Sequence, residues 1–276
     1  MSFTVRYECP GRLGNSIFPY ILCIIYQLMG YKYVNSKQDD EFNITDDIFL
    51  EMFNESMFLN KSLPKINKNI LITGYFQHFF MFKYYKEEII TFIKNNPDQD
   101  IYTALGSYTT YKSKILIDDY LPNIKLDKND IIVHIRLGDV VVDYLQETSP
   151  LFVISPYDYD KLLATIQYNN IYWIVEKPRN YIEDRYIKYM LNKWGGIYEE
   201  RTIEEDMCLM RKANTIICSR STLSWISSMF SIVDQKVFMP VKYENWTHES
   251  FTNIHSNTLL YNYTKCNKCM LYDILK

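Results

Sequence analysis

The alternation of short apolar runs with amphipathic segments over residues 131–239 constrains the fold more than any other feature of this chain. Short, unbroken apolar runs suit strands that are covered on both faces. Strands that alternate with helices along the chain form a parallel sheet. We therefore predict an α/β domain of the doubly wound kind. The five predicted strands lie at 131–135, 171–175, 197–198, 215–218 and 236–239.

Helix signals stand between these runs. Ser155-Pro156 has the residue types of an N-cap followed by the first helical position. Gly195 follows a segment at 182–194 and suits a helix C-terminus. Thr202 and Glu205 form a capping box that opens a helix ending near residue 212.

The first half of the chain gives weaker signals. A strand at 3–9, a glycine turn at 10–15 and an apolar helix at 17–29 resemble the start of a mononucleotide-type unit. A further strand is predicted at 70–74 and a helix at 83–94, whereas residues 36–68 are polar and resist assignment. We place an N-terminal α/β domain at 1–128, a C-terminal Rossmann-like domain at 129–246, and a tail at 247–276 that packs back on the N-terminal domain.

The usual strand order 3-2-1-4-5 predicts where ligands bind. It makes the strand that ends at Arg136 the neighbour of the strand that ends at Ser219, with the topological switch point between them. The loop that starts with Ser219 also contains Ser221, Thr222 and Ser224 and precedes a predicted helix. We therefore expect Arg136 and this loop to meet in one crevice.

This crevice has the chemistry of an anion site. The guanidinium of Arg136 matches phosphate oxygens, and the N–H groups at the start of a helix attract negative charge. Together they suit a pyrophosphate held without a metal, as in glycosyl transfer from a sugar nucleotide. The structural alternatives are a surface ion pair for Arg136 and ordinary helix caps for the serines.

Other functional motifs are weak or absent. The sequence has no P-loop motif, its Gly11–Gly14 spacing is not the dinucleotide fingerprint, and its net charge of −3 without charge blocks gives no sign of a nucleic-acid partner. Two Asp-x-Asp pairs, Asp98/Asp100 and Asp158/Asp160, are candidate divalent-metal ligands, but neither follows a predicted buried strand. A lone Cys-x-x-Cys at 266–269 lacks a second pair at zinc spacing, so we predict no metal site.

The sequence gives no sign of membrane insertion or secretion. We see no signal peptide, and the apolar segment at 17–29 is too short to span a bilayer. The expectation is a cytoplasmic enzyme without a transmembrane segment.

Four motifs in order resemble glycosyltransferase family 11, the α-1,2-fucosyltransferases, within the wider group of α-1,2-, α-1,6- and protein O-fucosyltransferases. The resemblance covers roughly residues 5–246. The motifs are Gly-Arg-Leu-Gly-Asn at 11–15, Gly-Tyr-Phe-Gln at 74–77, His-Ile-Arg-Leu-Gly-Asp at 134–139 and Ser-Arg-Ser-Thr-Leu-Ser-Trp at 219–225.

The resemblance implies a GT-B fold, in which two Rossmann-like domains face each other across a cleft. It implies GDP-fucose as the donor, a glycan acceptor such as a galactose hydroxyl, inversion at the fucose anomeric carbon, and no metal or other cofactor. Arg136 would bind the donor diphosphate and, with Asp139, would be catalytic. The remaining donor-binding residues would be Gly14, Asn15, His134, Ser219, Ser221, Thr222 and Ser224; His134 and Asp139 would shape their loop, and Asn15 would face the donor from across the cleft.

Two positions depart from the family pattern. The family usually has His-x-Arg-Arg-x-Asp, and here the second arginine is replaced by Leu137; the tryptophan pair is reduced to Trp225-Ile226. Loss of one arginine leaves open a catalytically weak or inactive GDP-sugar- or glycan-binding homologue. A GT-B transferase for another nucleotide sugar is the third interpretation. No carboxylate stands out as the general base, although Asp139 is one candidate.

Overall fold

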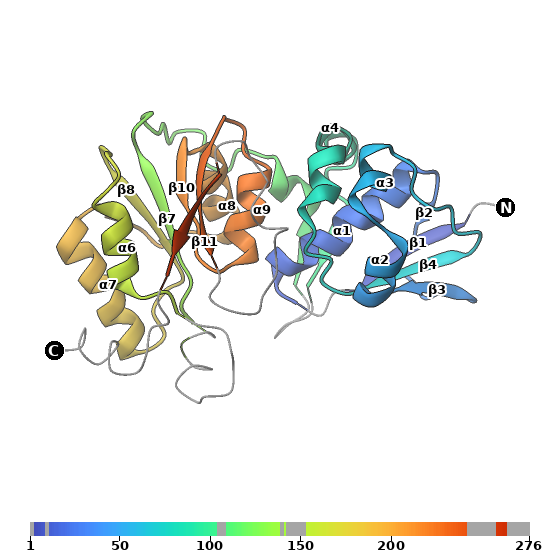
Figure 1. Cartoon of the computed structure of the whole chain (residues 1–276), viewed down its shortest axis with the longest axis horizontal. Helices are drawn as coiled ribbons and strands as arrows, with labels where there is room; N and C mark the ends of the chain where they lie inside the picture. The colour runs from blue at the N-terminus through green and yellow to red at the C-terminus, as the bar shows by residue number, and fades with distance from the viewer. Residues whose placement is uncertain are drawn as a thin grey trace. The chain divides into compact units, whose positions relative to one another are not determined.

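The computed structural model consists of two compact α/β units, Met1–Asp118 and Asp119–Lys276, each built on a parallel sheet (Figure 1). The structure describes residues 3–8, 11–103, 109–138, 141, 153–241 and 258–263.

The N-terminal unit has a four-stranded parallel sheet in the order β2-β1-β4-β3. Helix α1 packs on β1 and β4 and also contacts α4. A separate antiparallel pair, β5-β6, and a 3-10 turn, η1, follow α4. The bounds are β1 (Thr4–Glu8), α1 (Leu13–Leu28), β2 (Lys32–Tyr33), β3 (Glu41–Ile44), α2 (Asp46–Met52), α3 (Glu55–Leu59), β4 (Asn69–Thr73), α4 (Phe79–Asn95), β5 (Asp100–Tyr102), β6 (Thr110–Lys112) and η1 (Ser113–Leu116).

The prediction that residues 10–15 form a glycine turn is wrong for its last three residues, because α1 already begins at Leu13. The hydroxyl of Ser16 donates to the carbonyl oxygens of Gly11 and Arg12, at 3.3 and 3.1 Å. Gly14 is buried in the first turn of the helix. The apolar surface of α1 therefore starts four residues earlier than the apolar run suggested.

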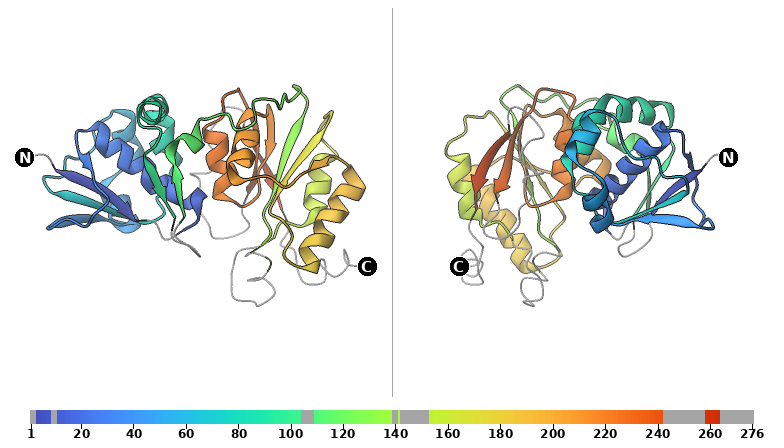
Figure 2. Two further views of the ribbon diagram at one scale, coloured as in Figure 1. Left: turned by 180° about the vertical axis from the view of Figure 1, so that it is seen from behind. Right: turned by 45° about the vertical axis from the view of Figure 1, so that its right-hand side comes forward.

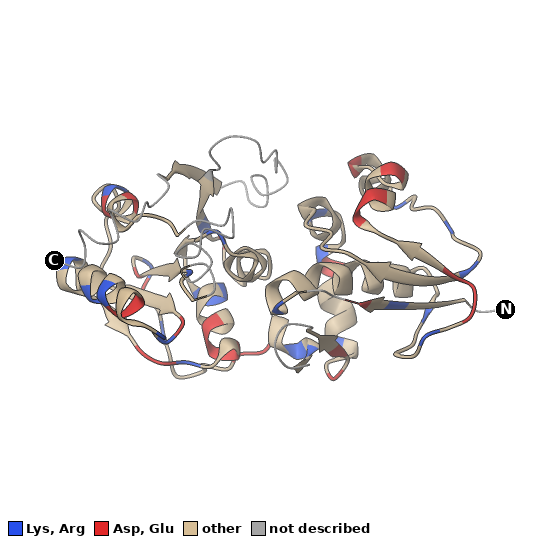
Figure 3. Cartoon of the chain, turned by 90° about the horizontal axis from the view of Figure 1, so that it is seen from below, with Lys and Arg blue, Asp and Glu red and all other residues tan. Residues whose placement is uncertain are grey.

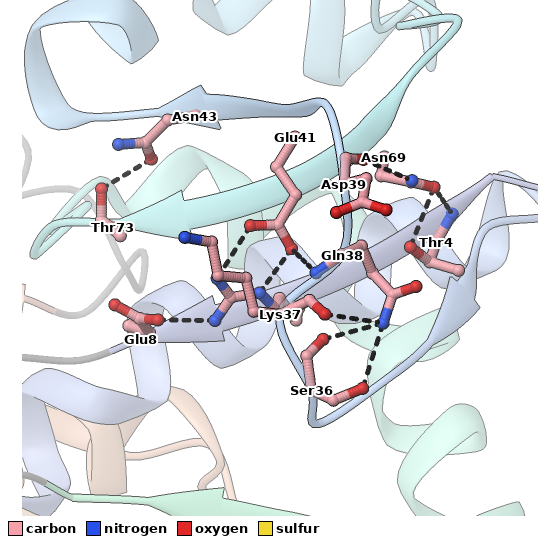
Figure 4. Close-up of polar contacts among 11 residues, drawn as sticks. Thr4, Glu8, Ser36, Lys37, Gln38, Asp39, Glu41, Asn43, Asn69 and Thr73 are labelled. Carbon is pink, nitrogen blue, oxygen red and sulfur yellow. Dashed lines mark hydrogen bonds and ion pairs between the residues drawn. The ribbon is translucent and has the colours of Figure 1, made fainter.

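The polar segment at 36–68, left unassigned from the sequence, contains β3, α2 and α3. Thr45 and Asn54 cap the two helices with their side chains, accepting from backbone N–H groups three residues later. Glu41, at the start of β3, accepts two hydrogen bonds from the guanidinium of Arg6 on β1, at 2.5 and 2.8 Å. Figure 4 shows Glu41 and Glu8 with their partners. This bidentate pair raises the pKa of Arg6, and Arg6 lowers the pKa of Glu41.

The C-terminal unit has a six-stranded parallel sheet in the order β12-β11-β10-β7-β8-β9. Helices α6 and α7 lie on one face of this sheet, and α8 and α9 lie on the other (Figures 1 and 2). The bounds are β7 (Ile131–Ile135), α6 (Pro156–Leu163), β8 (Ile171–Val175), α7 (Tyr181–Trp194), β9 (Ile197–Tyr198), α8 (Ile203–Lys212), β10 (Thr215–Ile217), α9 (Thr222–Met229), β11 (Lys236–Val241) and β12 (Thr258–Asn262).

The predicted strand order of this half is confirmed, because its first five strands follow the order 3-2-1-4-5. The helix signals are confirmed as well. Ser155 caps α6 ahead of Pro156, α7 ends before Gly195, and Thr202 and Glu205 make both hydrogen bonds of a capping box. Local capping chemistry and strand burial thus agree on one topology.

Strand β12 was not predicted. It lies in the tail that we expected to pack on the N-terminal domain, and it pairs in parallel with β11 of the C-terminal sheet. The C-terminal unit also starts earlier than the predicted boundary at 128. Lys212 on α8 binds the carboxylate of Asp119 and the carbonyl oxygen of Leu121, which ties this connecting segment to the second unit.

Alternate residues of β7 point to opposite faces of the sheet. Ile131, Val133, Ile135 and, beyond the strand end, Leu137 belong to one apolar cluster with residues of α6 and α7.

No helix in the described ranges is both long and apolar enough to span a membrane. Acidic and basic residues are interspersed along the ribbon (Figure 3).

Candidate functional site

The topological switch point of the C-terminal sheet lies between β7 and β10. These strands are hydrogen-bonded neighbours, paired from Thr215↔Ile131 to Ile217↔Val133, and the chain leaves them toward opposite edges of the sheet. The residues that follow their carboxyl ends therefore lie at the position where open α/β sheets bind ligands. The structure places Arg136 after β7 and Ser219 after β10, as the sequence predicted.

His134 and Ser219 link the two strands at this end. The Nδ1 atom of His134 and the Oγ atom of Ser219 are 2.8 Å apart and share a hydrogen bond. The two residues are only 6% and 3% exposed, so water does not compete for this contact. His134 lies one residue beyond the last register pair and Ser219 two residues beyond it, so the bond fixes the start of both loops.

Two tyrosine hydroxyls complete the hydrogen bonding where β7 and β10 end. Tyr159 of α6 donates to the carbonyl oxygen of His134 at 3.1 Å, and Tyr261 of β12 donates to that of Cys218 at 2.6 Å. Buried carbonyl groups need such partners once the strand ladder stops. Sequence analysis missed both tyrosines, because nothing in their local pattern separates them from the chain's 25 tyrosines.

The side chain of Arg136, the first residue after β7, is partly exposed. Its Nη1 atom donates to the carbonyl oxygen of Arg220 at 3.4 Å. Burial, together with the positive charge of Arg136, lowers the pKa of His134 to about 3. The imidazole is therefore neutral at pH 7, and its buried ring serves to hold the loops together.

The loop after β10 caps helix α9. Ser221 is the N-cap residue, and its hydroxyl accepts from the N–H of Leu223 at 3.2 Å. Thr222 is the first helical residue and is partly exposed. Ser224 is fully buried, and its hydroxyl donates to the carbonyl oxygen of Ser221 at 3.2 Å. Of these three side chains, Thr222 and Ser221 are the ones with surface to offer a ligand.

The loop after β7 turns sharply at Gly138. The φ angle there is +69°, and an added Cβ would lie 2.5 Å from Oε2 of Glu176, at the end of β8. The positive φ favours glycine, and the carboxylate of Glu176 would have to move to admit a Cβ. Glu176 also pairs with Arg179 at 2.9 Å. Asp139, the second predicted catalytic residue, lies outside the described residues.

The two N-terminal motifs come together within their own unit. The side-chain amide of Gln77 donates to Oδ1 of Asn15 at 3.1 Å. The carboxylate of Asp46 accepts from the N–H groups of Tyr75 and Phe76, and Phe76 takes a positive φ of 44°. Asp46 thus holds the 74–77 motif in a strained turn beside the first turn of α1, where sequence analysis named only Gly14 and Asn15.

The acidic pairs have structural partners. Asp160 accepts hydrogen bonds from Tyr189, Lys193 and Trp194 and so fastens α6 to α7. Asp100 accepts from Lys112 at 2.6 Å. Among the residues that the structure describes, no group of three or more His, Cys, Asp or Glu side chains is placed to hold a metal. Cys266 and Cys269 lie outside those residues.

Comparison with protein-family models, with curated proteins and with solved structures finds no match to this chain.

Proposed function

We propose that this chain is an inverting, metal-independent glycosyltransferase that moves L-fucose from GDP-fucose to a hydroxyl of galactose or a related hexose. The observation that carries the proposal is the adjacency of Arg136 to the Ser219–Thr222 loop at the switch point of the C-terminal sheet. Part of the proposal is that the two α/β units are the two domains of a GT-B enzyme, with the C-terminal unit binding the donor.

The chemistry assigns a role to Arg136. The acceptor oxygen forms a bond to the anomeric carbon of fucose while the bond from that carbon to the diphosphate oxygen breaks. The bonding electrons leave with GDP, and a base takes the acceptor proton. A fixed guanidinium stabilises the negative charge that grows on the diphosphate. Donors held in place before the reaction are most effective, and the Nη1 atom of Arg136 contacts the carbonyl oxygen of Arg220 at 3.4 Å.

His134 supports this site without serving as the base. Its ring is buried, its Nδ1 atom is engaged with Ser219, and its pKa is lowered to about 3. A base for the acceptor proton needs contact with the acceptor and a pKa nearer the working pH. We assign His134 to positioning the two loops, and we leave the base to a carboxylate.

The direct test is transfer from GDP-fucose to a panel of galactosides in EDTA, with GDP-mannose and a UDP-sugar as comparison donors. Product is followed by mass spectrometry and GDP release. We expect transfer from GDP-fucose, and a fall in rate of about 10²- to 10³-fold in Arg136→Ala. Arg185→Ala is the matched control, because it also removes an arginine but on α7, where Arg185 contacts the ring and hydroxyl of the exposed Tyr181.

Three results would contradict the proposal. Absence of both transfer and GDP binding would remove the donor assignment. Near-normal turnover in Arg136→Ala would make that arginine structural. Tight GDP binding without transfer to any acceptor would support the binding-protein alternative that the Leu137 departure keeps open.

A further inference from the structure

Arg136 and Arg220 are neighbours at the carboxyl edge of the sheet. The first follows β7 and the second follows β10, and the Nη1 atom of Arg136 lies 3.4 Å from the carbonyl oxygen of Arg220. Both side chains are partly exposed. Two guanidinium groups thus come from the two strands that flank the switch point, which is where a ligand is expected to bind.

The position next to Arg136 in the sequence offers no second cation. Leu137 is 2% exposed and belongs to the apolar cluster on the α6–α7 face, together with Ile135 and Val133. Leu137 is packed against these apolar neighbours and offers nothing to a ligand at the edge of the sheet. A second positive charge at the site has to come from another segment of the chain.

Arg220 has a built support. Its guanidinium carbon lies 6.0 Å from the centre of the Tyr263 ring, at the end of β12. Tyr263 is only 4% exposed, so the ring is a fixed surface for the guanidinium. A cation over an aromatic face is attracted to it, and a planar group held in this way loses less freedom when it binds an anion.

We propose that Arg220 is a donor-binding residue that, with Arg136, forms a two-arginine site for a diphosphate. The identity of the nucleotide, GDP, rests on the proposed function. The presence of a two-arginine anion site does not depend on it. Each phosphoryl group carries negative charge, and each guanidinium presents a planar pair of N–H donors to phosphate oxygens. The Ser221 and Thr222 end of α9 adds backbone N–H groups to the same edge.

A two-arginine site discriminates between phosphates. A diphosphate engages both guanidinium groups, whereas a nucleoside monophosphate engages only one of them. Loss of Arg220 should therefore weaken binding of GDP and of inorganic pyrophosphate more than binding of GMP.

The experiment is calorimetric titration of the full chain with inorganic pyrophosphate, GDP and GMP. The variants are Arg220→Ala, Arg220→Lys, Arg136→Ala and the control Arg185→Ala, which removes an arginine–tyrosine pair of similar geometry, 5.2 Å, on α7. We expect Arg220→Ala to weaken pyrophosphate and GDP binding about 10- to 100-fold and GMP binding by less than about threefold. Arg220→Lys keeps the charge without the planar fork and should fall between.

The outcomes separate this inference from the proposed function. Unchanged pyrophosphate and GDP affinity in Arg220→Ala overturns the role of Arg220 and leaves fucosyl transfer intact. Loss of pyrophosphate affinity in both arginine variants supports the two-arginine site even where no acceptor receives fucose. Equal losses for GMP and GDP overturn the claim that Arg220 reads the second phosphate, and failure of the unmutated chain to bind pyrophosphate or GDP overturns the site. A thermal unfolding curve for each variant confirms that it is folded.

Discussion

His134→Asn should remove a large part of the acid sensitivity of the C-terminal unit. The imidazole is buried 2.8 Å from the hydroxyl of Ser219, and burial with the nearby charge of Arg136 lowers its pKa to about 3. In the unfolded chain the same group titrates near 6.5. Asparagine keeps a polar atom near Nδ1 for Ser219 and does not titrate.

The sign and size of the effect follow from proton linkage. Between about pH 6.5 and 3 the unfolded chain binds a proton at His134 that the folded chain does not bind. The free energy of unfolding therefore falls as the pH falls through this window, by about 1.4 kcal/mol per pH unit for one group. From pH 7 to pH 5 the contribution is about 2 kcal/mol, and it is present in the wild type only.

The assay is urea unfolding followed by tryptophan fluorescence at pH 7 and pH 5. Trp173, Trp194 and Trp225 lie in the described part of the C-terminal unit, and the sequence has no tryptophan before residue 119, so the signal reports the unit that contains His134. The quantity of interest is the change in unfolding free energy between the two pH values, compared between wild type and variant. Other titrating groups are present in both proteins and cancel in this comparison. The same pH dependence in both proteins would refute a buried, neutral His134.

Three further predictions use the same unfolding measurement. Burial raises the pKa of Asp206 to about 7, so between about pH 4 and 7 the folded chain binds a proton that the unfolded chain lacks. The free energy of unfolding of the wild type therefore falls as the pH rises through this window. Asp206→Asn should be more stable than the wild type at pH 8, on the order of 2 kcal/mol, and as stable as the wild type near pH 4. Leu137→Arg should destabilise by about 3 kcal/mol or more because it places a charge in an apolar cluster, and equal stability with tighter GDP binding would contradict this. Gly138→Ala should destabilise by about 1–3 kcal/mol, since its φ is positive and its Cβ meets Glu176, whereas Gly30→Ala, also at a positive φ but with open space around it, should cost less.

The centre of the C-terminal sheet was predictable because β7, β8 and β10 are largely buried and the helices carry their own caps. The strand at 131–135 is buried at every position, so its apolar run is unbroken in the sequence. The bond between His134 and Ser219 was not predictable as a contact, but strand order already placed their loops together. Topology rules thus reached the candidate site before any side-chain geometry was known.

The parts that sequence analysis missed lack such signals. In β12 only Tyr261 is buried, and Leu259 and Leu260 are exposed, so the strand has neither an apolar run nor an alternation. Helix α1 begins in a segment whose two glycines suggested a turn. Gly14 is instead buried in the first turn of the helix. The local sequence does not show whether a glycine lies in a turn or at a buried helical position.

These missed residues make the candidate site depend on the last strand of the described sheet. Tyr261 and Tyr263 are two residues apart and so point to the same face of β12. They contact Cys218 and Arg220, which are also two residues apart, although β11 lies between the two strands. The two long aromatic side chains thus connect an edge strand to the carboxyl end of β10. A substitution that weakens the pairing of β12 with β11 would reach Arg220 through these rings, without touching the strands that flank the switch point.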